Sequence, residues 1–143
     1  ITFMKKSGTA TLSLDFFKAI ADKIVAFIAF DGDKAVAAAI CIKGNNGLYG
    51  RHWGCYEDYD SLHFELCYYT GIEYCINNQL QHFEPGAQGE HKIARGFLPT
   101  RTLSSHWVAH PEFNKIIKDH LQHESNAMEN YGKELADASP FKK

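Results

Sequence analysis

Three runs of strand-forming residues follow one another closely in the first half of the chain, at residues 25–30, 35–42 and 48–53. Asp31-Gly32-Asp33 separates the first two runs, and Gly44-Asn45-Asn46-Gly47 separates the second from the third. Both are turn sequences, because glycine, asparagine and aspartate accept the backbone angles that tight turns need. Connections this short join antiparallel neighbours. The sequence therefore predicts a three-stranded antiparallel meander, around which the rest of the fold must be built.

Helical spacing of apolar residues flanks this meander. It predicts a helix over residues 13–24 with Ser13 as N-cap, and a second over residues 61–80 with Ser61 as N-cap. Gly71 lies inside the second helix, where it is tolerable if another backbone packs closely. A third helix is predicted to begin at Pro111, and its apolar stripe is expected in the core: Phe113, Ile117, Leu121, Met128, Tyr131 and Leu135.

Two further strands complete the predicted order, a short buried one at residues 81–84 and a longer one at residues 100–108, which has β-branched and aromatic content. Helices and strands then follow one another without a repeat or a linker. The fold class is predicted to be α/β in the broad sense (α+β), with a mixed, mostly antiparallel sheet flanked by helices.

Chain length and net charge limit the number of domains and the kinds of ligand that we expect. The chain has 143 residues, of which 45% are hydrophobic, so we expect one domain with a single core. The net charge of -2 gives no positive field to hold duplex nucleic acid, although the end of a carrier RNA stays possible. No apolar stretch approaches the ~20 residues that span a bilayer. Because the chain starts at Ile1 without a methionine, we expect it to be cut from a longer protein.

The four cysteines contain no C-x-x-C pair and lie mostly among apolar or aromatic neighbours. We expect reduced, buried thiols in a cytoplasmic protein, with raised pKa values that make them poor nucleophiles. A metal site would have to use His63, Glu65, Cys67 and His91. Their spacing matches no known zinc pattern, so we expect no metal.

The richest polar segment of the chain is glycine-rich and covers residues 86–97. It holds Gly86, Gln88, Gly89, Glu90, His91, Lys92 and Arg95. Glycines let consecutive N–H groups face one concavity, and a nearby cation adds full charge, which favours a phosphate or carboxylate guest. We therefore expect this segment to line a concave site with Lys92 and Arg95 as anchors. The alternative is that both cations only pair with Glu84 and Glu90 at the surface.

Candidates for proton transfer are Glu90, His91, His63 and Glu65, since general acid–base catalysis needs such groups in a pocket. Each of them can also be an ordinary hydrogen-bonded residue. His106 is a further candidate, either closing the pocket or capping a strand. Strict alternation in the third strand places Tyr49, Arg51 and Trp53 on one face, where Arg51 is either a stacked structural cation or an anion clamp.

Three segments together resemble a known bacterial family: Leu48-Tyr49-Gly50-Arg51-His52-Trp53-Gly54, residues 62–73 and residues 86–97. The family is the FemAB-like group of peptidoglycan biosynthesis or recognition proteins in the GNAT superfamily, and the resemblance covers nearly the whole chain. It implies a GNAT-like acyltransferase fold of mixed sheet and flanking helices. It also implies two tandem copies in the full-length protein, with this chain as the C-terminal copy and an upstream domain as its partner.

The resemblance implies an enzyme of EC class 2.3 that passes an activated acyl or aminoacyl group to the amine of a small molecule or a peptidoglycan precursor. The donor is acyl-CoA or aminoacyl-tRNA. The superfamily's pyrophosphate motif, Gln/Arg-x-x-Gly-x-Gly/Ala, is only approximated by Arg51-x-x-Gly54-x-Tyr56, whose last position is bulky. Lys92 or Arg95 would stabilise phosphate or oxyanion charge. A non-catalytic domain that recognises a cell-wall ligand or an anionic small molecule is the alternative.

Overall fold

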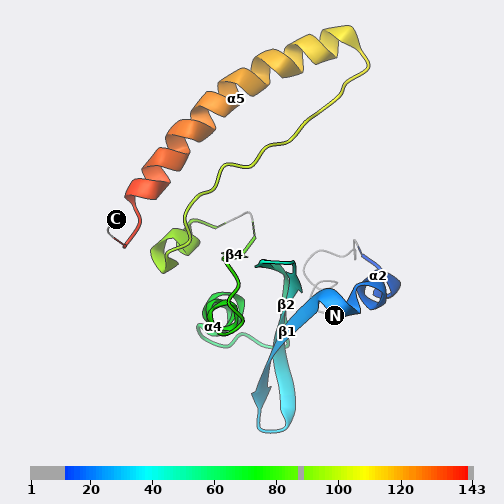
Figure 1. Ribbon diagram of the computed structural model, residues 1–143, viewed down its shortest axis with the longest axis vertical. Coiled ribbons are helices and arrows are strands. Elements are labelled where there is room, and N and C mark those ends of the chain that lie inside the picture. The colour runs from blue at the N-terminus through cyan, green and yellow to red at the C-terminus, as the bar shows by residue number, and fades with distance from the viewer. Residues whose placement is uncertain (1–11, 87–88, 142–143) are drawn as a thin grey trace. The chain divides into compact units, whose positions relative to one another are not determined.

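The computed structural model describes residues 12–86 and 89–141 of the chain (Figure 1). The chain divides into two compact units, residues 1–87 and residues 88–143, and each is described by itself. The first unit contains a sheet and the helices that pack on it. The second contains one short and one long helix.

The sheet of the first unit has four strands in the order β1-β2-β3-β4. β1 (Ile24–Asp31), β2 (Lys34–Lys43) and β3 (Gly47–Cys55) pair antiparallel, and β4 (His82–Glu84) pairs parallel to β3. The predicted meander and the predicted short strand are therefore confirmed. So is the fold class: a mixed α+β fold with a mostly antiparallel sheet.

A β-bulge interrupts the pairing of β2 with β3. Ile40 pairs with His52 and Cys41 pairs with Gly50, so Arg51 is an extra residue on β3. The bulge reverses the alternation of side chains beyond it. Trp53 consequently packs in the core beneath the helix, on the face opposite to Tyr49. The prediction that Tyr49, Arg51 and Trp53 share one face is wrong, because it assumed an unbroken strand.

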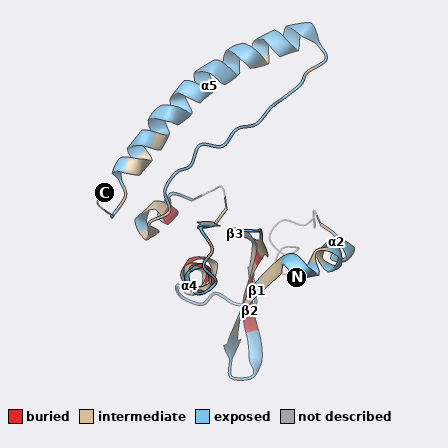
Figure 2. Cartoon of the chain, viewed as in Figure 1, coloured by how far each residue is buried: buried red, intermediate tan, exposed pale blue. Residues whose placement is uncertain are grey.

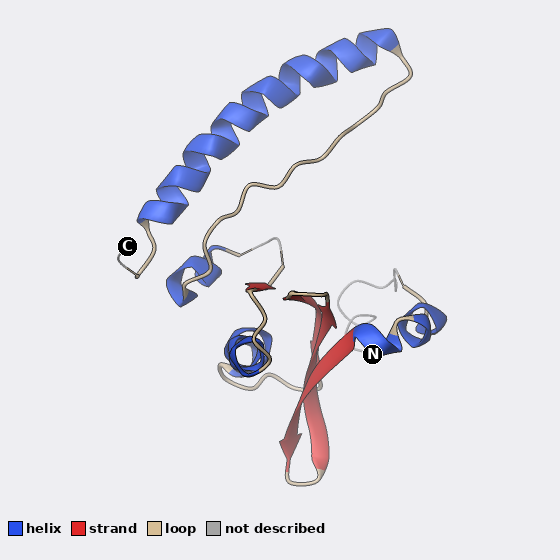
Figure 3. Cartoon of the chain, viewed as in Figure 1, coloured by secondary structure: helices blue, strands red, loops and turns tan. Residues whose placement is uncertain are grey.

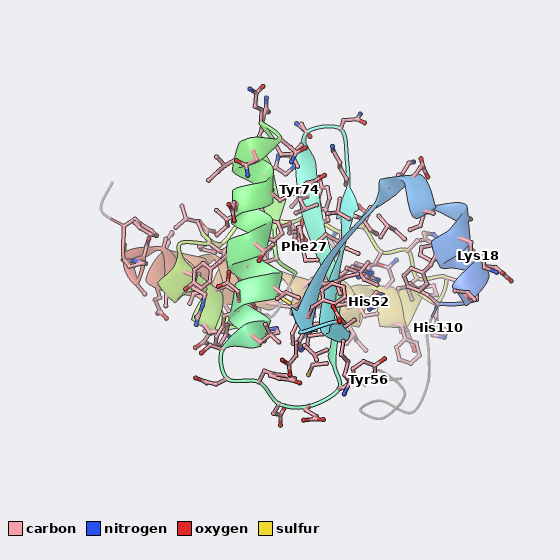
Figure 4. The ribbon with its side chains drawn as sticks, turned by 90° about the horizontal axis from the view of Figure 1, so that it is seen from below. Lys18, Phe27, His52, Tyr56, Tyr74 and His110 are labelled. Carbon is pink, nitrogen blue, oxygen red and sulfur yellow. The ribbon has the colours of Figure 1, made fainter. Side chains whose placement is uncertain are left out.

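One face of the sheet is covered by a helix with three segments: α3 (Leu62–Phe64), the π-helix η2 (Glu65–Tyr69) and α4 (Thr70–Asn77). Leu66 packs on Ala37 and Ala39, and Cys75 packs on Cys41 and Leu48. In Figure 4, Phe27 of β1 and Tyr74 of α4 lie toward one another, with ring centroids 5.7 Å apart. This layer is the hydrophobic core of the first unit.

The other face carries α2 (Leu14–Ala19) and η1 (Ala21–Lys23). Ser13 caps α2, as predicted, by accepting a hydrogen bond from the Phe16 N–H at 3.2 Å. The helix ends earlier than expected, because Ile24 and the residues after it pair with β2 as part of β1. Ser61 precedes α3 with a left-handed backbone and makes no side-chain cap, so its predicted capping role is wrong.

The second unit contains η3 (Glu90–Arg95) and α5 (Pro111–Asp137). Two predictions about this part are wrong. Residues 100–108 form no strand, and Figure 3 shows them as loop, because a strand needs a partner for its N–H and C=O groups. The apolar stripe of α5 is largely exposed rather than in a core (Figure 2): Phe113 is 60% and Met128 58% exposed.

Candidate functional site

In the first unit, β3 and β4 separate soon after they meet. Only Gly47, Leu48 and Tyr49 pair with β4, while β3 continues to Cys55. Gly50 lies against the turn after β4, since a Cβ there would be 3.3 Å from the Pro85 Cα. Pro85 has no N–H to continue the ladder. From Gly50 onward β3 therefore extends past its pairing with β4, and no other strand in the described ranges pairs with it on that side.

Arg51 lies at the bulge on this edge, and its side chain is exposed. The neighbouring His52 ring points to the other face of the sheet, where its centroid lies 5.6 Å from that of Phe17. Burial lowers the pKa of His52, and the positive charge of Arg51 lowers it further. The ring therefore favours its neutral form beside a fixed cation.

His63 lies among three aromatic rings. Its ring centroid is 5.4 Å from that of Trp53 on β3, 5.4 Å from that of Phe64 and 5.5 Å from that of Tyr68. The π-helix begins two residues later, and such segments are frequent at functional sites. His63 is thus half-buried beside the part of β3 that extends past β4. Glu65 is exposed, and residues two positions apart on a helix do not face each other, so the two predicted proton carriers are not paired.

In the second unit, residues 90–95 of the glycine-rich segment form a short 3-10 helix, η3, rather than an open loop. Gly89 precedes it with φ 109° and Gly96 ends it with φ 86°, and Gly86 of the first unit has φ 99°. The predicted need for glycine at these turns is confirmed. Lys92 is buried, with 9% of its surface exposed, and the Arg95 guanidinium donates a 2.7 Å hydrogen bond to the His91 carbonyl.

Glu90 has a partner that sequence reasoning missed. The Tyr131 hydroxyl on α5 donates a 2.5 Å hydrogen bond to the Glu90 carboxylate. This bond, followed by smaller effects of desolvation and nearby carboxylates, raises the pKa of Tyr131. The two residues are 41 positions apart, and Tyr131 looked like one more member of the apolar stripe, so the sequence held no signal for the pair. The His91 ring lies close over Gly89.

His106 lies on the segment that precedes α5. Its Nε2 is 3.0 Å from the Ser104 hydroxyl. It lines an open hollow of about 370 Å³, together with Val108 and residues on the first three turns of α5: Asn114, Ile117, Lys118, Leu121 and Gln122. This placement is away from η3, although both lie in the second unit.

The predicted site residues are divided between the two units. The first unit places Arg51, His63 and Glu65 around β3 and the helix that follows it, with Gly86 after β4. The second holds Gly89, Glu90, His91, Lys92 and Arg95 around η3, and His106 farther along. Gln88 lies outside the described residues. Trp53 was missed as a neighbour of His63, because only the bulge turns it toward the helix.

Two of the cysteine thiols are poorly suited to act as nucleophiles. Burial, and then the neighbouring Cys75, raise the pKa of Cys41 to about 11, and burial raises that of Cys75. Both thiols are therefore poor nucleophiles, as predicted.

No group of three histidine, cysteine, aspartate or glutamate side chains comes together within residues 12–86 and 89–141. Nor is any helix in these ranges long and apolar enough to cross a membrane.

Comparison with known proteins shows the family to which the chain belongs. A family model described as FemAB-like, peptidoglycan biosynthesis/recognition, matches residues 1–143. The chain belongs to this family. No curated protein and no solved structure matches it. The family relates the chain to the biosynthesis or recognition of peptidoglycan, and the predicted family membership is confirmed.

Proposed function

We propose that this FemAB-like chain is an acyltransferase domain that passes an activated acyl or aminoacyl group to an amine of a peptidoglycan precursor in the cytoplasm. The observation that carries the proposal is the half-buried His63, which packs on Trp53 of β3 two residues before a π-helix begins. Such helical segments are frequent at functional sites. The imidazole of His63 can accept a proton from a reacting amine.

The reaction forms one amide bond and breaks one thioester or ester bond. The acceptor amine attacks the acyl carbonyl, a base takes a proton from the nitrogen, and the donor leaves as a thiol or as the hydroxyl of the tRNA terminus after gaining a proton. We assign the base to His63. Lys92 or Arg95 is proposed to stabilise negative charge, and Glu90, His91 and Glu65 remain further candidates for proton transfer. We propose that the reaction proceeds without a metal ion.

The acyl donor is proposed to be acyl-CoA or aminoacyl-tRNA. Arg51 and Gly54 lie within β3 itself, whereas a pyrophosphate loop lies in the turn from a strand to a helix. This placement offers no support for the approximate motif at these positions, so both donors enter the test. The proposed upstream copy in the full-length protein would complete the acceptor site.

The test incubates the full-length protein with labelled acyl-CoA or aminoacyl-tRNA and a muropeptide amine. His63→Gln should lower the rate by about 10²-fold or more, the usual effect of losing a general base. His123→Ala, an exposed histidine on α5, is the matched control and should leave the rate unchanged. Full activity of His63→Gln would refute the assigned base.

The family description also includes recognition, which favours one alternative: a domain that binds a cell-wall ligand without turnover. The same samples separate the two functions. Tight binding of the muropeptide in calorimetry, with neither donor consumed by the full-length protein, would support recognition and contradict acyl transfer.

A further inference from the structure

β1 is an edge strand of the sheet that the described residues form. Its sequence from Ile24 to Phe30 is Ile-Val-Ala-Phe-Ile-Ala-Phe, which has no charge and no proline. The irregularity in its pairing with β2 puts the extra residue, Val36, on β2, so β1 itself stays regular. Natural edge strands are usually protected by charges, prolines or bulges of their own. β1 has none of these protections between its ends and is suited to pair with another strand.

Both faces of β1 are apolar. Val25, Phe27 and Ala29 point toward the helix layer and pack in the core. The alternate residues lie on the other face, where Ile28 is 50% and Phe30 60% exposed. A partner strand must therefore match one apolar row under the helices and a second row on the opposite face.

We propose that β1 pairs antiparallel with β1 of a second copy of this chain, about a two-fold axis at Phe27, so that two sheets join into one. This inference goes beyond the proposed acyl transfer and does not depend on it. Opposite residues of an antiparallel pair lie on the same face. With Phe27 opposite its own copy, every core-facing residue meets a core-facing residue, and a shift by one position would destroy this match.

The ends of the strand fix the same register by charge. With Phe27 on the axis, the strand end at Asp31 of the second copy approaches Lys23, the last residue of η1, and the symmetry repeats this pair of opposite charges at the other end. A shift that opposes Val25 and Asp31 would put a carboxylate against an apolar side chain. The side-chain sizes fit too, since Ala26 meets Ile28 and Val25 meets Ala29. The edge is thus self-complementary in face, charge and size.

The first experiment swaps the charges and measures self-association by sedimentation over a concentration series. The wild-type chain should dimerise in a concentration-dependent way. Lys23→Asp and Asp31→Lys each turn two attractive pairs into two repulsive ones, and each should weaken dimerisation by about tenfold. The double variant Lys23→Asp/Asp31→Lys restores both pairs and should recover the wild-type association.

Cross-linking tests the register with exposed residues. A mixture of Ala26→Cys and Ile28→Cys chains should form a disulfide-linked dimer under mild oxidation, because these positions are opposite each other. Either variant alone, and the wild-type chain with its native thiols, should cross-link much less. Far-UV circular dichroism confirms that each variant is folded.

The possible outcomes decide the proposal. A wild-type chain that stays monomeric at every concentration would overturn it and leave the edge to a strand of another protein. A dimer that neither the charge swap nor the cysteine mixture affects would place the contact elsewhere on the surface. Neither result bears on acyl transfer, which is measured separately.

Discussion

Gly71 shows how one missing side chain sets the distance between two elements. A Cβ at this position would lie 2.5 Å from the Phe83 Cζ on β4. The Phe83 ring packs against the core cluster of Cys41, Leu48 and Cys75, so it has little room to move. Gly71→Ala should therefore destabilise the chain by about 1–3 kcal/mol, as overpacking does, despite the better helix propensity of alanine. Urea denaturation followed by circular dichroism measures it.

Gly132 is the matched control for this prediction. It also lies inside a helix, α5, but a Cβ there would meet nothing within 4 Å. Gly132→Ala should be neutral or stabilise α5 by up to about 1 kcal/mol. If both alanines destabilise equally, the steric explanation for Gly71 is wrong.

The buried Cys41 thiol predicts a stability change in alkali. Its pKa rises from 9.0 to about 11 in the folded chain, so above pH 9 the unfolded chain ionises first. The unfolded state then binds fewer protons, and stability falls as the pH rises from 9 to 11, by at most about 3 kcal/mol. Below pH 9 this contribution is fully present.

Other groups titrate in the same range, so Cys41→Ala serves as the reference. Below pH 9 that variant is less stable than the wild-type chain because of the cavity it leaves. Its free energy of unfolding should nevertheless fall less steeply with pH than that of the wild-type chain. Parallel pH curves for the two proteins would contradict the prediction.

At the scale of elements, the strands were predictable because turn glycines and short connections leave few alternatives. The bulge at Arg51 was not, since nothing in the residues marks one extra position in a strand of nine. Residues 100–108 show the opposite error: their strand propensity is real, but propensity without a pairing edge makes no strand. The same reasoning misplaced the stripe of α5, because an amphipathic pattern does not say what covers it.

The exposed stripe of α5 gives a prediction at this scale. Met128 is 58% exposed, whereas Leu66 is 6% exposed and packs under the sheet. Met128→Gln should change the free energy of unfolding by no more than about 0.5 kcal/mol, while Leu66→Ala should cost about 2–5 kcal/mol. Chemical denaturation measures both. A large loss for Met128→Gln would show that α5 is part of the core after all.

At the scale of the whole molecule, the candidate site was predicted better in its residue types than in its grouping. Sequence reasoning found His63 and the glycines that flank Glu90–Arg95, because helical spacing and turn chemistry are local. It missed Trp53 beside His63 and Tyr131 bonded to Glu90. Both depend on packing between distant segments, which no local pattern encodes. One domain with one core also stays a prediction, since the chain divides into two compact units.

The exposure of the basic residues in the second unit predicts where trypsin cuts this unit first. Arg101 lies on the exposed segment that leads to α5, outside any helix or strand, whereas Lys92 is buried in η3 and Arg95 is half-buried there. Proteases need an extended, accessible backbone, so limited trypsin digestion should cut after Arg101 well before it cuts η3. Among the described residues, the core clusters of the first unit lie between Val25 and Phe83. The fragment that ends at Arg101 should therefore keep its strand signal in circular dichroism and unfold cooperatively, and Arg101→Gln should delay the cut. Loss of the strand signal as soon as Arg101 is cut would mean that the sheet depends on the second unit for its stability.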